Sequence, residues 1–176
     1  VHSAEATDQP SDSNSAASVG LNAYGQLGLG TTISAQTPTV INGLSDVVSF
    51  DGAVAHSLAV RSDGTVWGWG YAAFLGIGPV PGLQKSPVQV MGLTNIVAVA
   101  VGQGHSLALH ADGAVFTWGF IIGGTNTPVQ EPALANIVAI AAGLKHSLAL
   151  RSDGAVFSWG LNEHGQLGDG RTNTQT

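Results

Sequence analysis

Three near-copies of one fifteen-residue segment run through this 176-residue chain. They are HSLAVRSDGTVWGWG (56–70), HSLALHADGAVFTWG (105–119) and HSLALRSDGAVFSWG (146–160). The first two copies begin 49 residues apart, and the second and third begin 41 residues apart. Self-similarity at a spacing of about 20–50 residues is typical of repeat architectures, in which one supersecondary unit stacks against the next. The repeats therefore constrain the fold more than any other feature of the sequence.

Each unit contains four short segments with strand character. In the unit from Pro87 to Gly119 these are PVQV (87–90), NIVAVAV (95–101), HSLAL (105–109) and AVFTWG (114–119). An Asp-Gly pair separates the last two, which predicts a tight hairpin turn with positive φ at both residues. Four short strands per unit, without helical periodicity, are typical of propeller blades. We therefore predict an all-β fold of propeller-type, four-stranded antiparallel blades, in about three and a half repeats that form an incomplete or open propeller.

The repeat domain is expected to span residues 20–176, with units at about 20–70, 71–119 and 120–160 and a partial unit at 161–176. Residues 1–19 are acidic and rich in Ser, Ala and Asp, which is typical of a flexible tail. They also fit a degenerate half-repeat, because VHSAEA resembles the His-Ser segment and SNSAASVG ends where a Trp-Gly pair would stand. On either interpretation the chain is expected to begin and end inside a repeat.

The composition narrows the function classes. Only 9% of the residues are charged, against about 25% in an ordinary soluble domain, and the net charge is −6. The five basic residues are scattered, so the chain lacks the basic stripe that nucleic-acid binding requires. No segment approaches the ~18 uninterrupted apolar residues of a membrane span. The absence of cysteine excludes disulfides and fits many bacterial secreted proteins, so we expect a secreted or extracellular protein.

Taken together, the motifs resemble the regulator of chromosome condensation repeat family, in a bacterial-type form. The resemblance rests on the HSLA…DG…WG segments and on two near-identical connectors, GLNAYGQLGLG (20–30) and GLNEHGQLGDG (160–170). It implies a β-propeller, usually of seven four-stranded blades, in which the His, Trp and Gly positions are mainly structural and function lies on loops and faces. Bacterial relatives serve as binding modules, including protein inhibitors of enzymes. The nucleotide-exchange activity of the founding member depends on loops specific to that member and is not expected here.

The repeated polar and aromatic residues are interpreted as structural. His56, His105 and His146 are separated by a blade width, whereas zinc ligands converge to about 2.1 Å from one ion. Each imidazole is expected to hydrogen-bond the adjacent blade, each hairpin Asp to shape its turn, and each Trp before a glycine to pack between blades. These Asp and Trp residues are Asp63, Asp112, Asp153, Trp69, Trp118 and Trp159. The sequence shows no nucleophile, dyad or metal cluster, so no catalytic residue, metal or cofactor is expected.

The connectors between units are the best functional candidates. The polar connector is replaced by GYAAFLGIG (70–78) and then by the shortened GFIIGG (119–124). Large exposed apolar surfaces usually mark interfaces, although the two connectors could instead bury against each other. The candidate interface residues are Tyr71, Phe74, Leu75, Ile77, Phe120, Ile121 and Ile122.

Two non-enzymatic functions follow from these features. The first is a structural protein that self-associates through its split terminal repeats and apolar connectors. Because that contact is heterologous, it would produce a ring or a filament. The second is a protein-binding module, a fragment of a longer seven-bladed propeller that acts as a scaffold or inhibitor. The expected partner is therefore a second copy or another protein, with no nucleic acid and no membrane insertion.

Overall fold

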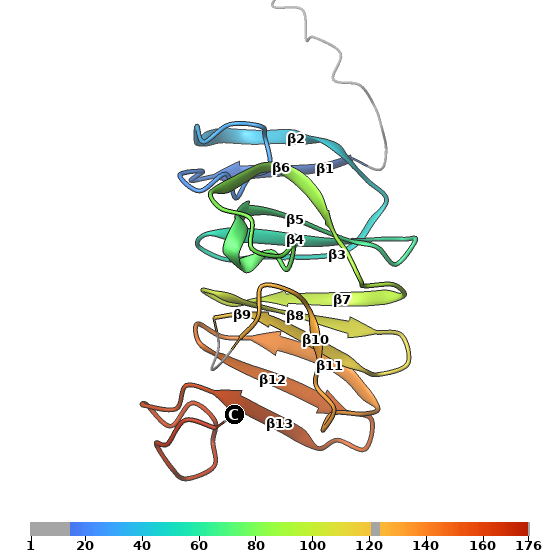
Figure 1. The fold of residues 1–176 in the computed structure, drawn as a ribbon, viewed down its shortest axis with the longest axis vertical. Coiled ribbons are helices and arrows are strands. Elements are labelled where there is room, and N and C mark those ends of the chain that lie inside the picture. Colours follow the sequence, from blue (N-terminus) through green and yellow to red (C-terminus); the bar gives the residue numbers. More distant parts are fainter. Residues whose placement is uncertain (1–14, 121–123, 176) are drawn as a thin grey trace, which may run out of the picture.

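The computed structural model describes residues 15–120 and 124–175, which form a stack of antiparallel β-sheets (Figure 1). In chain order the elements are β1 (Ser15–Gly20), β2 (Ala35–Ser45), β3 (Val47–Gly52), β4 (His56–Arg61), β5 (Val66–Tyr71), the 3₁₀ turn η1 (Ala72–Phe74), β6 (Leu83–Val90), β7 (Ile96–Val101), β8 (His105–His110), β9 (Val115–Gly119), β10 (Val129–Gln130), β11 (Ile137–Ala142), β12 (His146–Arg151) and β13 (Val156–Gly160).

These strands make four sheets: a half-blade (β1–β2), a first blade (β3–β6), a second blade (β7–β10) and a last blade (β11–β13). The first and second blades have four strands each, and the last blade has three. The prediction of an all-β, open propeller of about three and a half blades is confirmed.

The sheets are offset by one strand from the sequence units. The segment PVQV was assigned to the start of its unit, but in β6 it pairs with β5 of the preceding unit, with Val88 opposite Gly68. In the same way β10 pairs with β9, and β2 pairs with β1. Each of these sheets thus takes its outermost strand from the following unit, which ties successive units together through backbone hydrogen bonds.

The hairpin turns also differ from the prediction. Gly113 has a φ of 89°, but Asp112 is not among the described non-glycine residues with positive φ. Gly113 N donates to His110 O at 2.9 Å, and His110 N donates to Ala114 O at 2.9 Å. The loop is therefore one residue longer than a two-residue hairpin, and only its glycine is left-handed. Asp112 instead accepts Ala114 N through Oδ1 at 2.9 Å.

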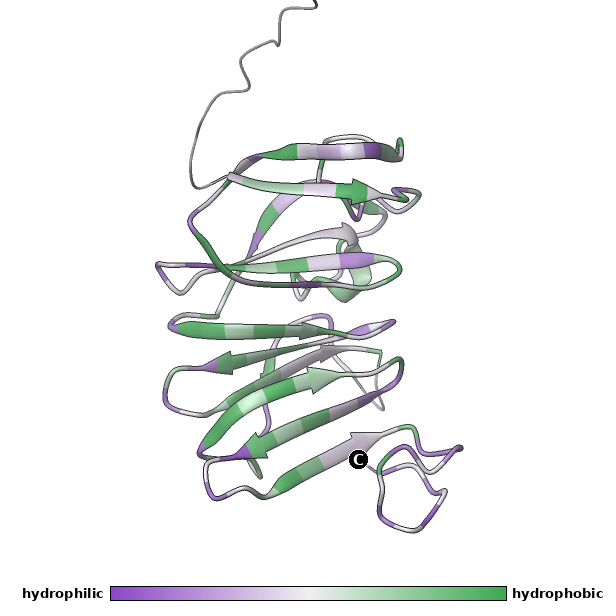
Figure 2. Ribbon diagram, turned by 180° about the vertical axis from the view of Figure 1, so that it is seen from behind, coloured by the Kyte–Doolittle hydropathy of each residue, from purple (hydrophilic) through white to green (hydrophobic). Residues whose placement is uncertain are grey.

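The apolar core lies between neighbouring sheets. Figure 2 shows apolar residues along the stacked strands and polar residues in the loops. The cluster between the first and second blades contains Leu58, Val60, Val66, Val90, Leu93, Ile96, Val99, Val101, Ala108 and Trp118. The cluster between the second and last blades contains Ala100, Leu107, Leu109, Val115, Ile137 and Ala149. Middle strands are covered on both faces, which explains why their sequences are almost continuously apolar.

The described part of the chain begins with a strand. Residues 15–20 form β1, in which Ala17 lies opposite Val40 and Ser18 lies opposite Thr39 of β2. Residues 1–14, to which the tail and half-repeat interpretations also applied, lie outside the described residues. Over the described ranges, no helix has the length and apolar character needed to cross a membrane.

Candidate functional site

The connectors leave every blade at the same end, which we call the connector face. Each connector begins after the glycine that ends a Trp-Gly strand, and its first residue donates its N–H to the residue that precedes the repeated histidine. The three pairs are Tyr71 N to Ala55 O (2.8 Å), Phe120 N to Gly104 O (2.7 Å) and Leu161 N to Lys145 O (2.8 Å). The close approach requires glycine, because a Cβ on Gly119 would lie 2.5 Å from Gly104 O. These backbone hydrogen bonds therefore fix the position of the first residue of each connector.

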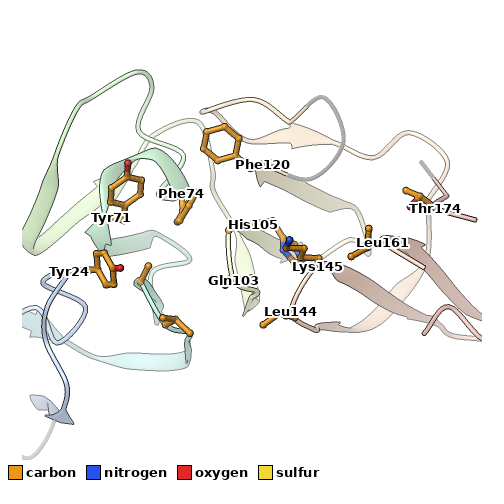
Figure 3. Close-up of a pocket in the computed structure, with 13 residues that line it drawn as sticks. Tyr24, Tyr71, Phe74, Gln103, His105, Phe120, Leu144, Lys145, Leu161 and Thr174 are labelled. Carbon is orange, nitrogen blue, oxygen red and sulfur yellow. The ribbon is translucent and has the colours of Figure 1, made fainter. Parts of the chain in front are cut away.

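A groove of about 790 Å³ lies on the connector face. Figure 3 shows Tyr24, Tyr71 and Phe74 at one end, Leu161 and Thr174 at the other, and His105 between them. The lining residues are Tyr24, Val54, Ala55, Tyr71, Phe74, Gln103, Gly104, His105, Phe120, Leu144, Lys145, Leu161 and Thr174. Most of this lining is apolar, and Lys145 is the only Asp, Glu, Lys or Arg residue among the described residues that form it.

Four aromatic rings from three connectors form a continuous row in the groove. The ring centroids are 6.4 Å apart between Tyr24 and Tyr71, 5.0 Å between Tyr71 and Phe74, and 5.6 Å between Phe74 and Phe120. The first and last of these contacts are edge-to-face, at 84° and 87°, which is a favourable arrangement for aromatic pairs. Phe120 nevertheless remains 70% exposed. The rings therefore hold one another in place while part of their apolar surface remains exposed.

The structure divides the predicted interface residues. Tyr71, Phe74 and Phe120 line the groove. Leu75 does not line the groove: it is fully buried and lies over Gly68 of β5. Ile77 packs against the core cluster between the first and second blades. Ile121 and Ile122 lie outside the described residues.

Several lining residues were missed by the sequence analysis. Val54 and Leu144 stand two positions before a repeated histidine, and Leu161 directly follows a Trp-Gly pair, as Tyr71 and Phe120 do. Leu144 is 63% exposed, so it contributes open apolar surface to the groove. Comparison of equivalent repeat positions would have revealed these residues, whereas a search for apolar segments could not.

Hydrogen bonds between blades anchor the wall of the groove. His56 Nε2 lies 2.8 Å from Ser106 Oγ, which joins the first blade to the second. Ser106 Oγ lies 3.2 Å from Phe74 O and donates to it, and Trp118 Nε1 donates to the same carbonyl at 2.9 Å. One connector turn repeats this arrangement, since Gln26 O accepts Ser57 Oγ and Trp69 Nε1. The repeated His, Ser and Trp residues thus position the connector that carries Phe74.

The two inner histidines are neutral at pH 7. Burial, and secondarily repulsion from His105, lowers the pKa of His56 to about 3. Burial, and secondarily repulsion from His146, lowers the pKa of His105 to about 4. Because the Ser106 hydroxyl donates to Phe74 O, we assign the His56 proton to Nε2, which donates to Ser106. The Nδ1 atoms of both histidines are buried without a hydrogen-bond partner, which fits this assignment.

The three repeated aspartates lie in the hairpin turns and not in the groove. Each accepts the backbone N–H two residues ahead. The pKa of Asp63 is lowered by the hydrogen bond from the Thr65 hydroxyl and then by the Thr65 N–H. The pKa of Asp112 is lowered by the Ala114 N–H and then by the His110 side chain. The Arg151 guanidinium, followed by the Ala155 N–H, lowers the pKa of Asp153 to about 2. Within residues 15–120 and 124–175, no group of three His, Cys, Asp or Glu side chains is placed to hold a metal ion.

The outer face of the last blade is a second notable surface. Val156 is 64% exposed, whereas its counterparts Val66 and Val115 are fully buried. Leu150 is 37% exposed, against 4% for Leu109 at the same repeat position. In the inner blades these positions are covered by the next blade, whereas on the last described blade they are exposed.

Comparison with known proteins identifies the repeat. The regulator of chromosome condensation (RCC1) repeat model matches residues 18–60 and 63–109, and a second model of the same repeat matches residues 137–166. No curated protein sequence matches the chain.

Solved structures share the fold. Human WBSCR16 is 27% identical with a TM-score of 0.82, over 93% of this chain and 47% of that protein. Yeast RCC1 (Prp20) bound to Kap60 is 21% identical with a TM-score of 0.80, over 92% and 43% of the two chains. Prp20p from Saccharomyces cerevisiae, in a second structure, is 22% identical with a TM-score of 0.78, over 90% and 44%. The chain thus spans less than half the length of these relatives. With repeat models matching most of its length, it belongs to the regulator of chromosome condensation (RCC1) repeat family.

Proposed function

We propose that the chain is a non-enzymatic protein-binding module that docks a partner on its connector face. The observation that carries this proposal is the groove of about 790 Å³, whose aromatic row is left open. Contiguous apolar surface rimmed by polar residues is characteristic of protein interaction sites. The fold is compatible with such a role, since yeast Prp20 has been crystallised with Kap60 bound.

The groove offers both apolar area and rigidity. Complete burial of a large apolar side chain contributes about 1.5–3 kcal/mol, so Phe120, Leu144 and Tyr71 could together support binding. The rings are held by edge-to-face packing, and the Phe74 backbone is fixed by Ser106 and Trp118. A site that is ordered before binding loses less conformational entropy when the partner arrives.

Selection from a phage-displayed random peptide library against the 176-residue chain would test this proposal. The selected peptides should lose at least tenfold in affinity for the Phe120→Asp and Leu144→Asp variants, because each places a charge in the groove. Val138→Asp is the matched control, since Val138 is 55% exposed on β11 but does not line the groove. Peptides that bind all three variants with equal affinity would overturn the proposal.

A second candidate function is self-association, and the uncovered face of the last blade favours it. We propose that another copy covers this face through an end-to-end contact, to which the apolar connectors could add. Such a contact uses different surfaces on the two copies and therefore builds a ring or a filament. The exposure of Leu150 and Val156, at positions that are buried in the inner blades, supports this candidate.

Light scattering on purified protein would test self-association. The wild-type chain should form a large species that Val156→Glu dissociates, with the β-signal in circular dichroism unchanged. Val138→Glu is the control, because Val138 is 55% exposed and its counterpart Val97 is 48% exposed even in an inner blade. A folded wild-type monomer at micromolar concentration would contradict this candidate function.

A further inference from the structure

The two ends of the groove differ in chemistry. Tyr24 and Tyr71 make one end aromatic, while Lys145 lies beside Leu144 and Leu161 towards the other (Figure 3). His105 also lines the groove, but it is neutral because burial lowers its pKa to about 4. Among the described residues, the lining contains no Asp or Glu. The described part of the lining therefore presents a single formal charge, and that charge is positive.

Lys145 is a charged residue at a repeat position where the other two copies have a small uncharged residue. The residues directly before the other two repeated histidines are Ala55 and Gly104, and both line the same groove. Lys145 is exposed, and no carboxylate of the described residues is paired with its ammonium group. The chain as a whole has 11 acidic and 5 basic residues. A cation at the apolar groove thus runs against the overall charge of the protein.

We infer that the groove binds an apolar segment of a protein partner that carries an Asp or Glu side chain facing Lys145. This inference rests on the proposed protein-binding function and specifies the partner. Apolar side chains of the segment would pack against Tyr71, Phe74 and Phe120, and the carboxylate would set its position along the groove.

The chemistry of the lining favours this partner. An ammonium–carboxylate pair at the edge of an apolar surface is partly shielded from water and forms a charge-assisted hydrogen bond, which contributes mainly to register and association rate. A sugar would need a hydrogen-bonding partner for most of its hydroxyl groups. Apart from tyrosine hydroxyls, the described lining offers mainly Gln103, Lys145 and Thr174 for that purpose.

The test uses a phage-displayed twelve-residue random library, in which no peptide has a free C-terminal carboxylate. Peptides selected on the wild-type chain should be rich in aromatic and aliphatic residues and should share one Asp or Glu. Lys145→Glu should reduce their affinity at least tenfold, and replacing the shared acidic residue of the peptide by Lys should restore binding to that variant. Lys85→Glu is the matched control, because Lys85 is also exposed but does not line the groove.

The outcomes separate this inference from the proposed function. The inference is supported if peptide affinity falls with Lys145→Glu, is restored when the acidic residue of the peptide is replaced by Lys, and does not fall with Lys85→Glu. Peptides that need Phe120 but bind the Lys145→Glu variant with wild-type affinity overturn the inference and leave the protein-binding function standing. If no selected peptide depends on Phe120 or Leu144, the proposed function is overturned, and this inference falls with it.

Discussion

His56 of the first blade and Ser106 of the second blade are joined side chain to side chain, with 2.8 Å between Nε2 and Oγ. The next pair repeats the contact, since His105 Nε2 lies 3.2 Å from Ser147 Oγ. The repeated His-Ser dipeptide therefore acts across blades: the histidine of one copy meets the serine of the next copy. Among the described residues, His146 has no such serine partner.

Removal of one imidazole should destabilise the protein. In His105→Ala the buried Ser147 hydroxyl would lose its partner, and we expect the free energy of unfolding to fall by about 1–3 kcal/mol. His146→Ala is the control, with less than half of that effect, because His146 makes no serine contact in the described chain. Urea denaturation followed by tryptophan fluorescence would measure both. Stoichiometric zinc that survives dialysis and disappears with His105→Ala would instead show that the histidines bind metal.

The buried histidines His56 and His105 predict how the free energy of unfolding depends on pH. In the unfolded chain each would titrate near 6.5, whereas the folded pKa is about 3 for His56 and about 4 for His105. Between these limits the unfolded state binds more protons, so acidification favours unfolding. The free energy of unfolding should have its full value above about pH 6.5. It should fall as the pH drops from about 6.5 towards 4, the folded pKa of His105, and then towards 3, the folded pKa of His56.

This dependence is best measured between pH 7 and 5, before the turn carboxylates with lowered pKa values begin to titrate. The midpoint of urea unfolding should decrease over that range. The His105→Gln variant, which keeps a donor near Ser147, should show a smaller decrease. A wild-type midpoint that does not change between pH 7 and 5 would contradict the assignment of buried neutral histidines.

The sequence predicted the blades because their signals are local. The His-Ser and Trp-Gly strands are adjacent in the chain and joined by an Asp-Gly turn, so their pairing follows from a short segment. The outermost strands were assigned to the wrong sheet because PVQV in β6 could pair on either side of its unit. Only the three-dimensional arrangement, with Val88 opposite Gly68, decides which partner it takes.

The groove was predicted only in part, for a related reason. Phe74 and Phe120 stood out because they replace a polar connector. Leu75, which directly follows the turn η1, is fully buried, and no simple periodicity in such a short connector indicates this. Leu144 and Leu161 are single apolar residues in loops, and only the alignment of equivalent blade positions brings them to the same face.

A matched pair of turn glycines can isolate the contact between blades. Gly113 and Gly154 have nearly the same φ, 89° and 90°, so alanine at either site should cost about 1–3 kcal/mol in backbone strain. A Cβ on Gly113 would also lie 2.9 Å from Asn136 Cα of the next blade, whereas nothing lies within 4 Å at Gly154. Gly113→Ala should therefore be more destabilising by a further ~1–3 kcal/mol. Equal losses in urea denaturation would mean that the blades separate easily at this turn.

The valine that follows each hairpin turn offers a final test, which also bears on self-association. Val115 is fully buried by the last blade, so Val115→Ala should lower the free energy of unfolding by about 1.5–3 kcal/mol at any protein concentration. Val156, at the same position of the last blade, is 64% exposed. Val156→Ala should therefore change the free energy of unfolding by less than ~0.5 kcal/mol in dilute solution. If a second copy covers the last blade, mass action makes the effect of Val156→Ala grow as the protein is concentrated. Urea denaturation at two widely separated concentrations measures this difference, and a small, concentration-independent effect of Val156→Ala would contradict end-to-end association through this face.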